Sequence, residues 1–524
     1  MILLREKPFA FAFSIFEERV DNTCHYCFAA GTSGESDIGG DTQNSSDDGC
    51  KASLMRCSRC RFARYCNVQC QRNDFADHKL QCRALAAVDP AYPSMDTRLF
   101  AQIIFKTVEK QNSYYVGTLS QGKVKRGLWD LVWHSERLEI DVMRKVRVQI
   151  RCRQVERYLG RSGIHFCNGE EDGFIKRGDK DSIYIKRKQL IKVCCIIDIN
   201  AASVRDSHDD LVGTALYLKQ SWIDHSCVPN CSFFHHGQEI IIYSHSNSPG
   251  LAWEEPPQQL RISYIPLVFD TAERRKRLQA DYNFWCECPR CQDRDGDAMA
   301  NGVYCRKCST GVAVPIRGNS GLGDAGKMSY CCTQELCGAV FEGDDSYAIQ
   351  AVLNAKTLYS ELQDIPDRSR PPNDSALLSL FKRYEEVKLA IPSCNVLRGP
   401  LAREVQDKMV PIEHKDVLDR LLAYGRDELE TYRVFYAPND SSLLAMIASV
   451  VNRYQVCINF ELVQRREITP EVKRMVEEAN DYIDEVIRGV EDAVGPGENC
   501  HLFPVLSIVI STGLVSKCSR RSEP

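Results

Sequence analysis

Residues 56–82 read RCSRCRFARYCNVQCQRNDFADHKLQC, and with two cysteines upstream they form four closely spaced pairs of metal-ligating side chains. The pairs are Cys24-x2-Cys27, Cys57-x2-Cys60, Cys66-x3-Cys70 and His78-x3-Cys82. Each spacing lets both members of a pair reach one ion from a turn or from one face of a helix. Eight sulfur and nitrogen donors are what two tetrahedral zinc ions require. Scattered buried cysteines would have to produce four such pairs by chance, so we predict two structural zinc sites.

The rest of the chain has the composition of a globular protein with several domains. It has 524 residues, of which 44% are hydrophobic and 26% charged, and its net charge of −4 argues against a globally basic nucleic-acid binder. We expect neither secretion nor a membrane span, because the N-terminus lacks a signal pattern and the longest apolar run, Phe503–Val515, is short and interrupted. The 26 cysteines are then better explained by zinc thiolates than by disulfides.

Local patterns predict strands in the middle of the chain and helices on either side. Three short segments rich in β-branched residues predict strands: Leu190–Ile197, Glu239–Tyr243 and Arg261–Tyr264. Residues 95–165 have a more helical pattern and are locally basic. Residues 31–49 are acidic and glycine-rich, which predicts a disordered insertion.

After residue 345 the pattern becomes helical. One predicted helix follows the capping candidates Asp374 and Ser375 and has apolar residues spaced three and four apart as far as residue 391. Another begins at Thr469, with Pro470 in its first turn, and carries its apolar face as far as Gly489. Several such helices with short links predict an antiparallel array, and their lengths suggest a tetratricopeptide-like domain.

Three further motifs occur in a fixed order: DHSCVPNC at 224–231, RISY at 261–264 and ERRKRLQADYNFWCECPRC at 273–291. They resemble the N-H-S-C-x-P-N motif, the tyrosine-bearing strand and the post-SET segment of SET-domain lysine methyltransferases. Residues 56–82 resemble a MYND zinc finger, with Phe75 where that pattern has tryptophan. The chain is therefore similar to the SET-and-MYND-domain lysine methyltransferases, closely over residues 1–300 and loosely beyond.

This resemblance implies how the zinc ligands are grouped. One zinc would bind Cys24, Cys27, Cys66 and Cys70, a second Cys57, Cys60, His78 and Cys82, and a third Cys227, Cys286, Cys288 and Cys291. The third zinc would hold the post-SET segment over the active site. A last cysteine-rich stretch, with Cys305 and Cys308 followed by Cys331, Cys332 and Cys337, resembles a zinc ribbon. We predict a fourth site on Cys305, Cys308, Cys332 and Cys337; the alternatives are Cys331 in place of Cys332, or a reduced cysteine-rich hairpin.

The resemblance also implies S-adenosylmethionine as the methyl donor, with Tyr264 and Tyr282 as catalytic residues. Tyr264 matches the catalytic tyrosine, Tyr282 an aromatic residue of the lysine channel, and Phe284 one that lies against the cofactor. The residues implied to bind the cofactor are Trp129, Asn200, Ser221, Asp224, His225, Tyr264 and Phe284. For Trp129, a plain role in the hydrophobic core is an equal alternative.

Three departures from the family pattern bear on activity. Asp224 stands where asparagine is usual, which adds a charge and removes two donors. Ala202 falls where the family has a lysine-channel phenylalanine, which would widen the channel. Met1 begins a segment resembling the one just after the family's Gly-x-Gly loop. We expect an incomplete gene model or an alternative start, and therefore weak cofactor binding by the 524-residue form.

We predict an α+β multidomain protein with a β-rich SET core split by a MYND finger, a zinc-bound post-SET segment and a helical C-terminal domain. The boundaries are 1–23 for the N-terminal part of the SET domain, 24–82 for the finger, 83–272 for the SET domain with a helical insertion, 273–300 for the post-SET segment, 301–340 for the ribbon and 341–524 for the helical domain.

The predicted function is methyl transfer to lysines of histones or other proteins, with a non-catalytic peptide-docking adaptor as the alternative. The finger's basic residues predict a docking surface for peptide or DNA, with a solvated face as the alternative: Arg56, Arg59, Arg61, Arg64, Arg72, Lys79 and Arg83. We expect a monomer in the nucleus and cytoplasm, with no membrane partner.

Overall fold

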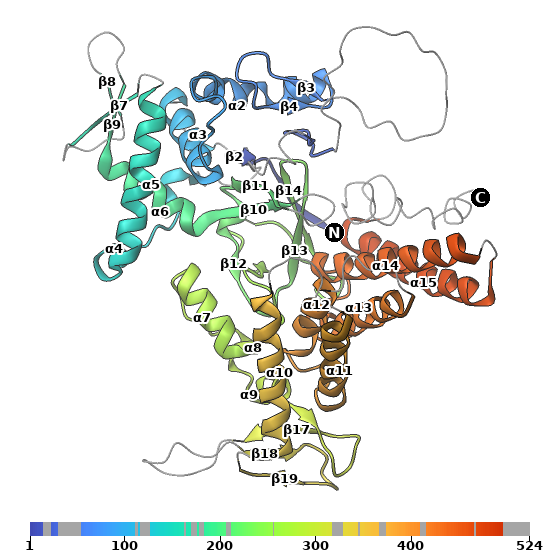
Figure 1. The fold of residues 1–524 in the computed structure, drawn as a ribbon. Helices are drawn as coiled ribbons and strands as arrows, with labels where there is room; N and C mark the ends of the chain where they lie inside the picture. The colour runs from blue at the N-terminus through green and yellow to red at the C-terminus, as the bar shows by residue number, and fades with distance from the viewer. Residues whose placement is uncertain are drawn as a thin grey trace.

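A computed structural model shows a mixed helix and strand protein built from several units (Figure 1). It describes residues 1–13, 22–29, 54–110, 114–115, 126–161, 164–168, 175–177, 183–205, 211–254, 256–316, 329–343, 346–365, 374–408, 415–465 and 468–495. The predicted insertion at 31–49 and the apolar run from Phe503 lie outside these residues. In Figure 1 the finger lies at the top, sheets in the centre, a helical array at the right and a small sheet at the lower tip.

Two three-stranded antiparallel sheets form the centre. One has the order β1 (Ile2–Glu6), β14 (Glu239–Ser244), β13 (Cys231–His236), and the other β10 (Ala201–Arg205), β11 (Leu211–Leu216), β2 (Ala10–Phe13). Apolar residues from both sheets share one buried cluster. The strand predicted at 239–243 is confirmed. Ile2 pairs with Tyr243, so the first strand of the chain forms one edge of this sheet.

A layer of helices covers the second sheet. It comprises α3 (Met95–Lys110), α4 (Arg137–Ile140), α5 (Val142–Gly160) and α6 (Arg187–Asn200). The strand predicted at 190–197 is wrong, because these residues lie within α6. Leu190, Val193, Cys194 and Ile197 are three and four apart and are all buried in the core that α6 shares with α3 and α5. A short apolar run has the same appearance in a buried helix as in a strand.

Smaller elements complete this region. They are β5 (Tyr114–Tyr115), β6 (Arg126–Gly127), the 3-10 turn η1 (Leu128–Asp130), β7 (Ile164–Cys167), β8 (Ile175–Arg177) and β9 (Ile183–Lys186). The finger consists of β3 (Met55–Arg56), β4 (Arg64–Tyr65) and α2 (Val68–Ala86). The side chain of Asn67 caps α2 by accepting a hydrogen bond from the Cys70 amide over 2.8 Å.

The next elements lie beside the central sheets or lead from them to the lower tip of the molecule. They are η3 (Gln220–Trp222), β12 (Asp224–His225), β15 (Arg261–Ile262), α7 (Thr271–Asp281), α8 (Pro289–Gln292) and α9 (Arg294–Met299). A four-stranded sheet, here called the ribbon, follows with the order β16 (Val303–Tyr304), β17 (Val312–Ile316), β18 (Ser329–Cys332), β19 (Val340–Phe341).

Helices make up the described chain beyond residue 345. They are α10 (Tyr347–Asp364), α11 (Asp374–Ala390), α12 (Arg398–Asp407), α13 (Lys415–Phe435), α14 (Ser441–Arg465) and α15 (Pro470–Val494). Helices α12 to α15 pack in sequence order, each on the next. The predicted start of α15 is confirmed, because Thr469 accepts from the Val472 amide. Its predicted end at Gly489 is wrong: the helix continues to Gly495, whose φ of 85° ends it.

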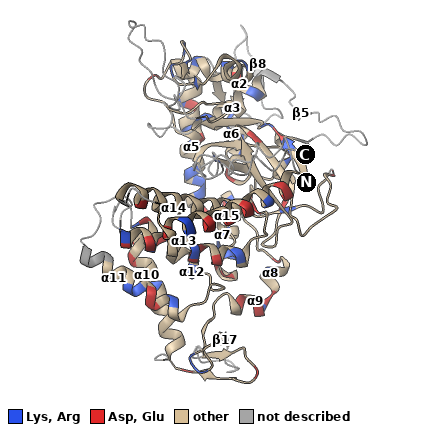
Figure 2. Ribbon diagram, turned by 90° about the vertical axis from the view of Figure 1, so that its right-hand side faces the viewer, with Lys and Arg blue, Asp and Glu red and all other residues tan. Residues whose placement is uncertain are grey.

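Charges of both signs are interspersed over this array (Figure 2) and pair between helices. Arg433 lies 2.7 Å from Glu485, and Lys415 lies 3.1 Å from Glu471. Within the described chain, one helix is long and apolar enough by composition to cross a membrane, Ser441–Gln464 of α14. It packs between α13 and α15 and 56% of its apolar window is buried, as expected for the core helix of a globular domain.

A buried polar joint connects the first sheet to the helical array. Ser232 of β13 hydrogen-bonds His245 Nε2 over 2.8 Å and also the carboxylate of Asp440, just before α14. Beside it, the Tyr243 hydroxyl donates to the Asn439 carbonyl over 2.8 Å. Because these groups are buried, each depends on its partner for hydrogen bonding, and the two units are held in one relative position.

Candidate functional site

Two short strands bring together the segments that the sequence motifs mark. β12 pairs in parallel with β15, with Asp224 opposite Arg261 and His225 opposite Ile262. The pairing extends one residue further, because the Ser226 amide donates to the Ile262 carbonyl over 3.0 Å. The DHSCVPNC and RISY motifs therefore lie side by side, although they are far apart in sequence.

Asn230 fixes the register of this pairing. Its Oδ1 accepts from the Arg261 amide over 2.8 Å, and its Nδ2 donates to the Gln259 carbonyl over 2.8 Å. Its own amide donates to the Arg261 carbonyl over 3.1 Å. The sequence analysis assigned no role to Asn230. Its position within the DHSCVPNC motif was the only feature that could have indicated one.

Tyr264 follows β15 and points its hydroxyl at the backbone just before the DHSCVPNC motif. The hydroxyl donates to the Ile223 carbonyl over 2.5 Å, and the Tyr264 amide donates to His225 Nδ1 over 3.0 Å. The Tyr282 hydroxyl in turn donates to the Tyr264 carbonyl over 3.3 Å. Burial raises the pKa of Tyr282, which keeps its hydroxyl protonated as a donor.

Four rings gather around Tyr264. Its ring centroid lies 4.9 Å from Tyr282, 5.3 Å from His225 and 6.4 Å from Phe284, and the last two lie 5.9 Å apart. Burial lowers the pKa of His225 to about 4, so its imidazole is neutral. Since Nδ1 accepts from the Tyr264 amide, the ring proton resides on Nε2. We call these four residues the aromatic cluster.

A group of four cysteines lies directly against the aromatic cluster. Its members are Cys227, Cys286, Cys288 and Cys291, whose sulfurs all lie within 4.8 Å of one another. His225 Nε2 is 3.2 Å from the Cys227 sulfur, and the buried Arg274 donates to the Cys291 sulfur over 3.6 Å. Both donors point at sulfur, as the hydrogen-bond partners of metal-bound thiolates do. The chemistry of this donor set fits zinc.

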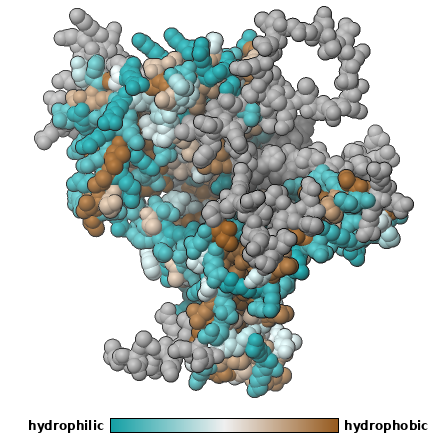
Figure 3. Space-filling view, in the orientation of Figure 1, coloured by the Kyte–Doolittle hydropathy of each residue, from teal (hydrophilic) through white to brown (hydrophobic). Residues whose placement is uncertain are grey.

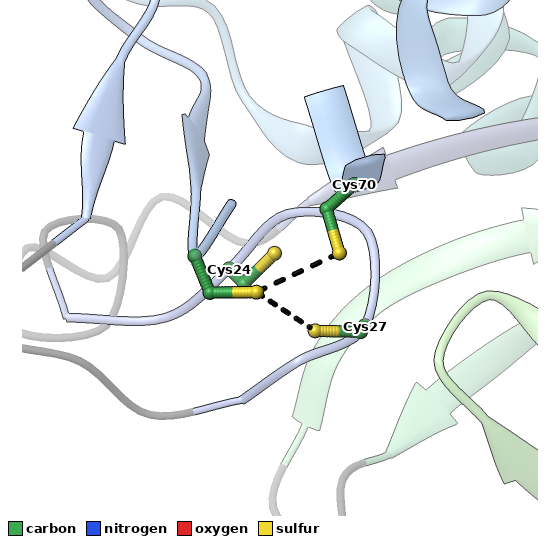
Figure 4. A group of neighbouring side chains, drawn as sticks. Cys24, Cys27 and Cys70 are labelled. Carbon is green, nitrogen blue, oxygen red and sulfur yellow. Dashed lines mark hydrogen bonds between the residues drawn. The ribbon is translucent and has the colours of Figure 1, made fainter. Parts of the chain in front are cut away.

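The finger contains two more such groups. They are Cys24, Cys27, Cys66 and Cys70, and Cys57, Cys60, His78 and Cys82. In Figure 4 the sulfurs of Cys24, Cys27 and Cys70 point toward one another. Sulfur separations of 3.6 Å for Cys27–Cys66 and 3.8 Å for Cys57–Cys82 are near the ~3.8 Å expected around a tetrahedral zinc. Every described cysteine is a free thiol.

The ribbon holds a fourth group. Cys305, Cys308, Cys332 and Cys337 have their sulfurs within 4.8 Å of one another. The structure thus brings Cys332, rather than Cys331, to the other three. All sixteen ligands predicted from the sequence therefore lie in the four groups in which they were predicted.

The basic surface expected on the finger needs one correction. Arg64 is buried, because its place on β4 turns it into the finger, and its backbone carbonyl accepts from the His25 amide over 2.8 Å. The other expected members are exposed: Arg56, Arg59, Arg61, Arg72, Lys79 and Arg83. Phe75 is also exposed.

Asn200 and Trp129 lie in the helical layer. Asn200 ends α6, and its Nδ2 donates to the Val132 carbonyl over 2.8 Å. Trp129 is partly buried against the core of that layer, and Lys192 Nζ lies 5.3 Å from its ring centroid. Both proposed roles of Trp129, core residue and adenine contact, are compatible with this position.

The remaining predicted residues lie near Tyr264 or at the edge of its core. Ser221 lies in η3, and its hydroxyl donates to the Leu218 carbonyl over 3.0 Å. Asp224 is exposed. Ala202, on β10, is partly buried and packs on the same hydrophobic core as Tyr264.

Glu6 is a site residue that sequence analysis missed. It is buried at the end of β1, and its two carboxylate oxygens accept from the amides of Lys219 and Gln220, each over 2.8 Å. These bonds hold the loop that leads into η3 and Ile223. The sequence feature that could have indicated its role is an acidic residue at the end of a largely apolar strand.

Comparison with known proteins agrees with this geometry. The MYND finger family model matches residues 24–82. Human histone-lysine N-methyltransferase SMYD3 is 29% identical over 248 residues, which is 47% of this chain and 51% of that protein. Human N-lysine methyltransferase SMYD2 is 25% identical over 291 residues, 55% of this chain and 54% of that protein. The chain therefore contains a MYND finger and is similar to SMYD lysine methyltransferases.

The chain spans about half the length of the SMYD relatives that it matches. The chicken SMYD2 protein, also named an N-lysine methyltransferase, is 27% identical over 256 residues, 48% of this chain and 51% of that protein. Similarity to relatives that are named lysine methyltransferases supports a methyltransferase role.

Proposed function

We propose that this protein is an S-adenosylmethionine-dependent protein-lysine N-methyltransferase and that the aromatic cluster is its active site. The observation that carries the proposal is the position of Tyr264. Its hydroxyl donates to the carbonyl of Ile223, the residue just before the DHSCVPNC motif, and its amide donates to His225 of that motif.

The chemistry of the cluster fits a sulfonium cofactor. S-adenosylmethionine carries a positive charge on sulfur and supplies the methyl group when bound. Aromatic faces and carbonyl oxygens attract such a cation, and Tyr264, Phe284 and the Ile223 carbonyl offer both kinds of group. Asn200, Ser221 and Asp224 are the further residues proposed to hold it, with Trp129 beside the adenine.

The residues of the chain align the two reactants and exclude water. Methyl transfer to an amine is an in-line displacement, so alignment and desolvation supply most of the catalysis. A lysine amine must be neutral to attack, and the loss of water where the rings of Tyr264 and Tyr282 enclose the amine disfavours its charged form. The neutral, partly buried His225 holds the backbone of Tyr264 in place. The third zinc would hold Tyr282 and Phe284 by fixing the segment between them and Cys286.

A methylation assay with Tyr264→Phe tests this proposal. The zinc-loaded chain is incubated with methyl-labelled S-adenosylmethionine and a mixture of histones and lysine peptides. We expect lysine methylation by the wild type and a loss of about 100-fold or more in Tyr264→Phe, because a positioned hydroxyl is removed from the reaction centre. Tyr359→Phe, on α10 and outside the cluster, should retain activity.

If the wild type methylates no lysine while it folds and binds zinc, the peptide-docking adaptor is the correct function. Equal activity of the two tyrosine variants would instead show that Tyr264 is a packing residue.

The wider assignment follows from the same proposal. The substrate would be a histone or another protein that enters between the SET core and a tetratricopeptide-like helical domain. The exposed arginines of the finger would dock peptide or DNA. We propose the domain boundaries given above, a monomeric state, and a location in the nucleus and cytoplasm.

A further inference from the structure

We propose that the ribbon binds a fourth structural zinc ion through Cys305, Cys308, Cys332 and Cys337, and that this ion braces the start of the helical array. The Cys305–Cys337 and Cys308–Cys332 sulfur pairs are each 3.7 Å apart. A disulfide requires about 2.05 Å, whereas ligands of a tetrahedral zinc lie ~3.8 Å apart. The spacing therefore fits four thiolates around one ion.

The backbone of the ribbon repeats that of the finger. In the finger, the residues after the first two cysteine pairs, Phe28 and Arg61, have left-handed φ values of 66° and 56°. Their amides donate to the carbonyl of the first cysteine of each pair over 3.0 Å and 2.9 Å. In the ribbon, Ser309 has a φ of 58°, and its amide donates to the Cys305 carbonyl over 2.9 Å.

This conformation is unfavourable for residues other than glycine by roughly 1 kcal/mol. Its recurrence after three Cys-x2-Cys pairs, two of them in a segment that matches the MYND finger model, needs a common cause. A metal that draws both sulfurs of each pair to one point supplies that cause. The reduced hairpin supplies none.

Gly311 shows how closely the ribbon fits around the four sulfurs. Its amide donates to the Cys308 sulfur over 3.3 Å, which favours the thiolate form. A Cβ on this residue would lie 2.7 Å from the Cys332 sulfur and 3.1 Å from the Cys308 sulfur. Only glycine fits without moving a ligand.

The side of the ribbon that holds the cysteines has little apolar material, because the buried Val303, Ala313 and Tyr330 belong to the cluster shared with α10. Among the described residues, the cluster around the four ligands contains only Ala339 and Phe341 in addition. In Figure 3 the region of β17 to β19 forms a small lobe at the lower tip, with teal and brown surface on it. So small a core is insufficient to order four short strands, and a structural metal can provide the missing stability.

The ribbon packs against Tyr347, the first residue of α10. The Arg306 guanidinium, between two of the proposed ligands, lies 3.7 Å from the ring centroid of Tyr347. Phe341 of β19 packs edge-on against the same ring at 6.5 Å. Val303 and Tyr330 of the sheet share a buried cluster with the alanines of α10. An ion that orders the ribbon would therefore also fix where α10 begins.

Native mass spectrometry of the full-length chain tests the site. We expect four zinc ions in the wild type and three in the Cys308→Ser/Cys332→Ser double variant. The matched control is Cys331→Ser, on the same strand but outside the group, which should retain four. Hydrogen exchange should become faster in α10 of the double variant and stay unchanged in α14.

The fourth site would be overturned if the wild type carried three zinc ions, or if the double variant carried as many zinc ions as the wild type. Loss of one ion with unchanged exchange in α10 would overturn the bracing role. If the double variant does not fold, Cys337→His keeps four donors, and its cobalt-loaded form should show weaker thiolate-to-cobalt absorption than the wild type. An unchanged cobalt spectrum would also overturn the site.

Discussion

Glu6 illustrates how one buried side chain can hold the loop that leads to the aromatic cluster. Its carboxylate is buried, and its hydrogen-bond partners are the amides of Lys219 and Gln220. Burial raises its pKa from 4.5 to about 7. The difference corresponds to roughly 3 kcal/mol between the two protonation states.

This shift predicts a pH-dependent stability. Between pH 4.5 and 7 the folded protein retains a proton on Glu6 that the unfolded chain has lost, so stability falls as the pH rises through this window and is level above it. From pH 5.5 to 8 the loss should be roughly 2 kcal/mol. The free energy of unfolding is measured for wild type and Glu6→Gln at each pH. The Glu6→Gln protein should not show this loss of stability.

Glu239→Gln is the matched control, since Glu239 lies on the neighbouring strand and is only partly buried. It should follow the wild-type pH dependence. The zinc thiolates are present in all three proteins, so their own pH dependence cancels in the comparison. Parallel curves for wild type and Glu6→Gln would contradict the account of Glu6.

At the scale of elements, the sequence predicted features that depend on neighbouring residues. Thr469 and Pro470 mark the start of α15, and the cysteine spacings mark the ligand pairs, because both patterns act within a few residues. The grouping of distant pairs into metal sites came from the family resemblance. The buried helix α6 was mistaken for a strand, since its apolar run has no exposed face to reveal the helical period. Glu6 and Asn230 act on partners distant in sequence, and local patterns do not predict those.

The cap of α15 yields a second prediction. Thr469→Ala removes the acceptor of the Val472 amide and should lower the free energy of unfolding by about 1 kcal/mol. Thr469→Ser keeps the acceptor and should be close to wild type. Denaturant unfolding of the three proteins measures the difference, and equal loss in both variants would assign the effect to the lost methyl group instead.

At the scale of the whole molecule, the parts around the active site are connected to one another. Tyr436 of the helical array accepts from the Leu267 amide over 2.9 Å, just after the RISY segment. Arg290, between two ligands of the third metal group, lies 4.7 Å from the ring of Phe435. Together with the joint at Ser232 and Asp440, these contacts let the helical array and the third metal group position the aromatic cluster.

Calorimetric titration of S-adenosylmethionine into the zinc-loaded chain tests this account most directly. We predict saturable binding at one site, with the weak affinity expected for the 524-residue form. Phe284→Ala should weaken it at least about tenfold, because an aromatic face against a desolvated cation contributes roughly 2 kcal/mol. Phe460→Ala, in α14 and away from the cluster, should bind as wild type does. Absence of binding to the folded wild type, or equal affinity of the Phe284→Ala protein, would contradict the central claim that the aromatic cluster is a cofactor site.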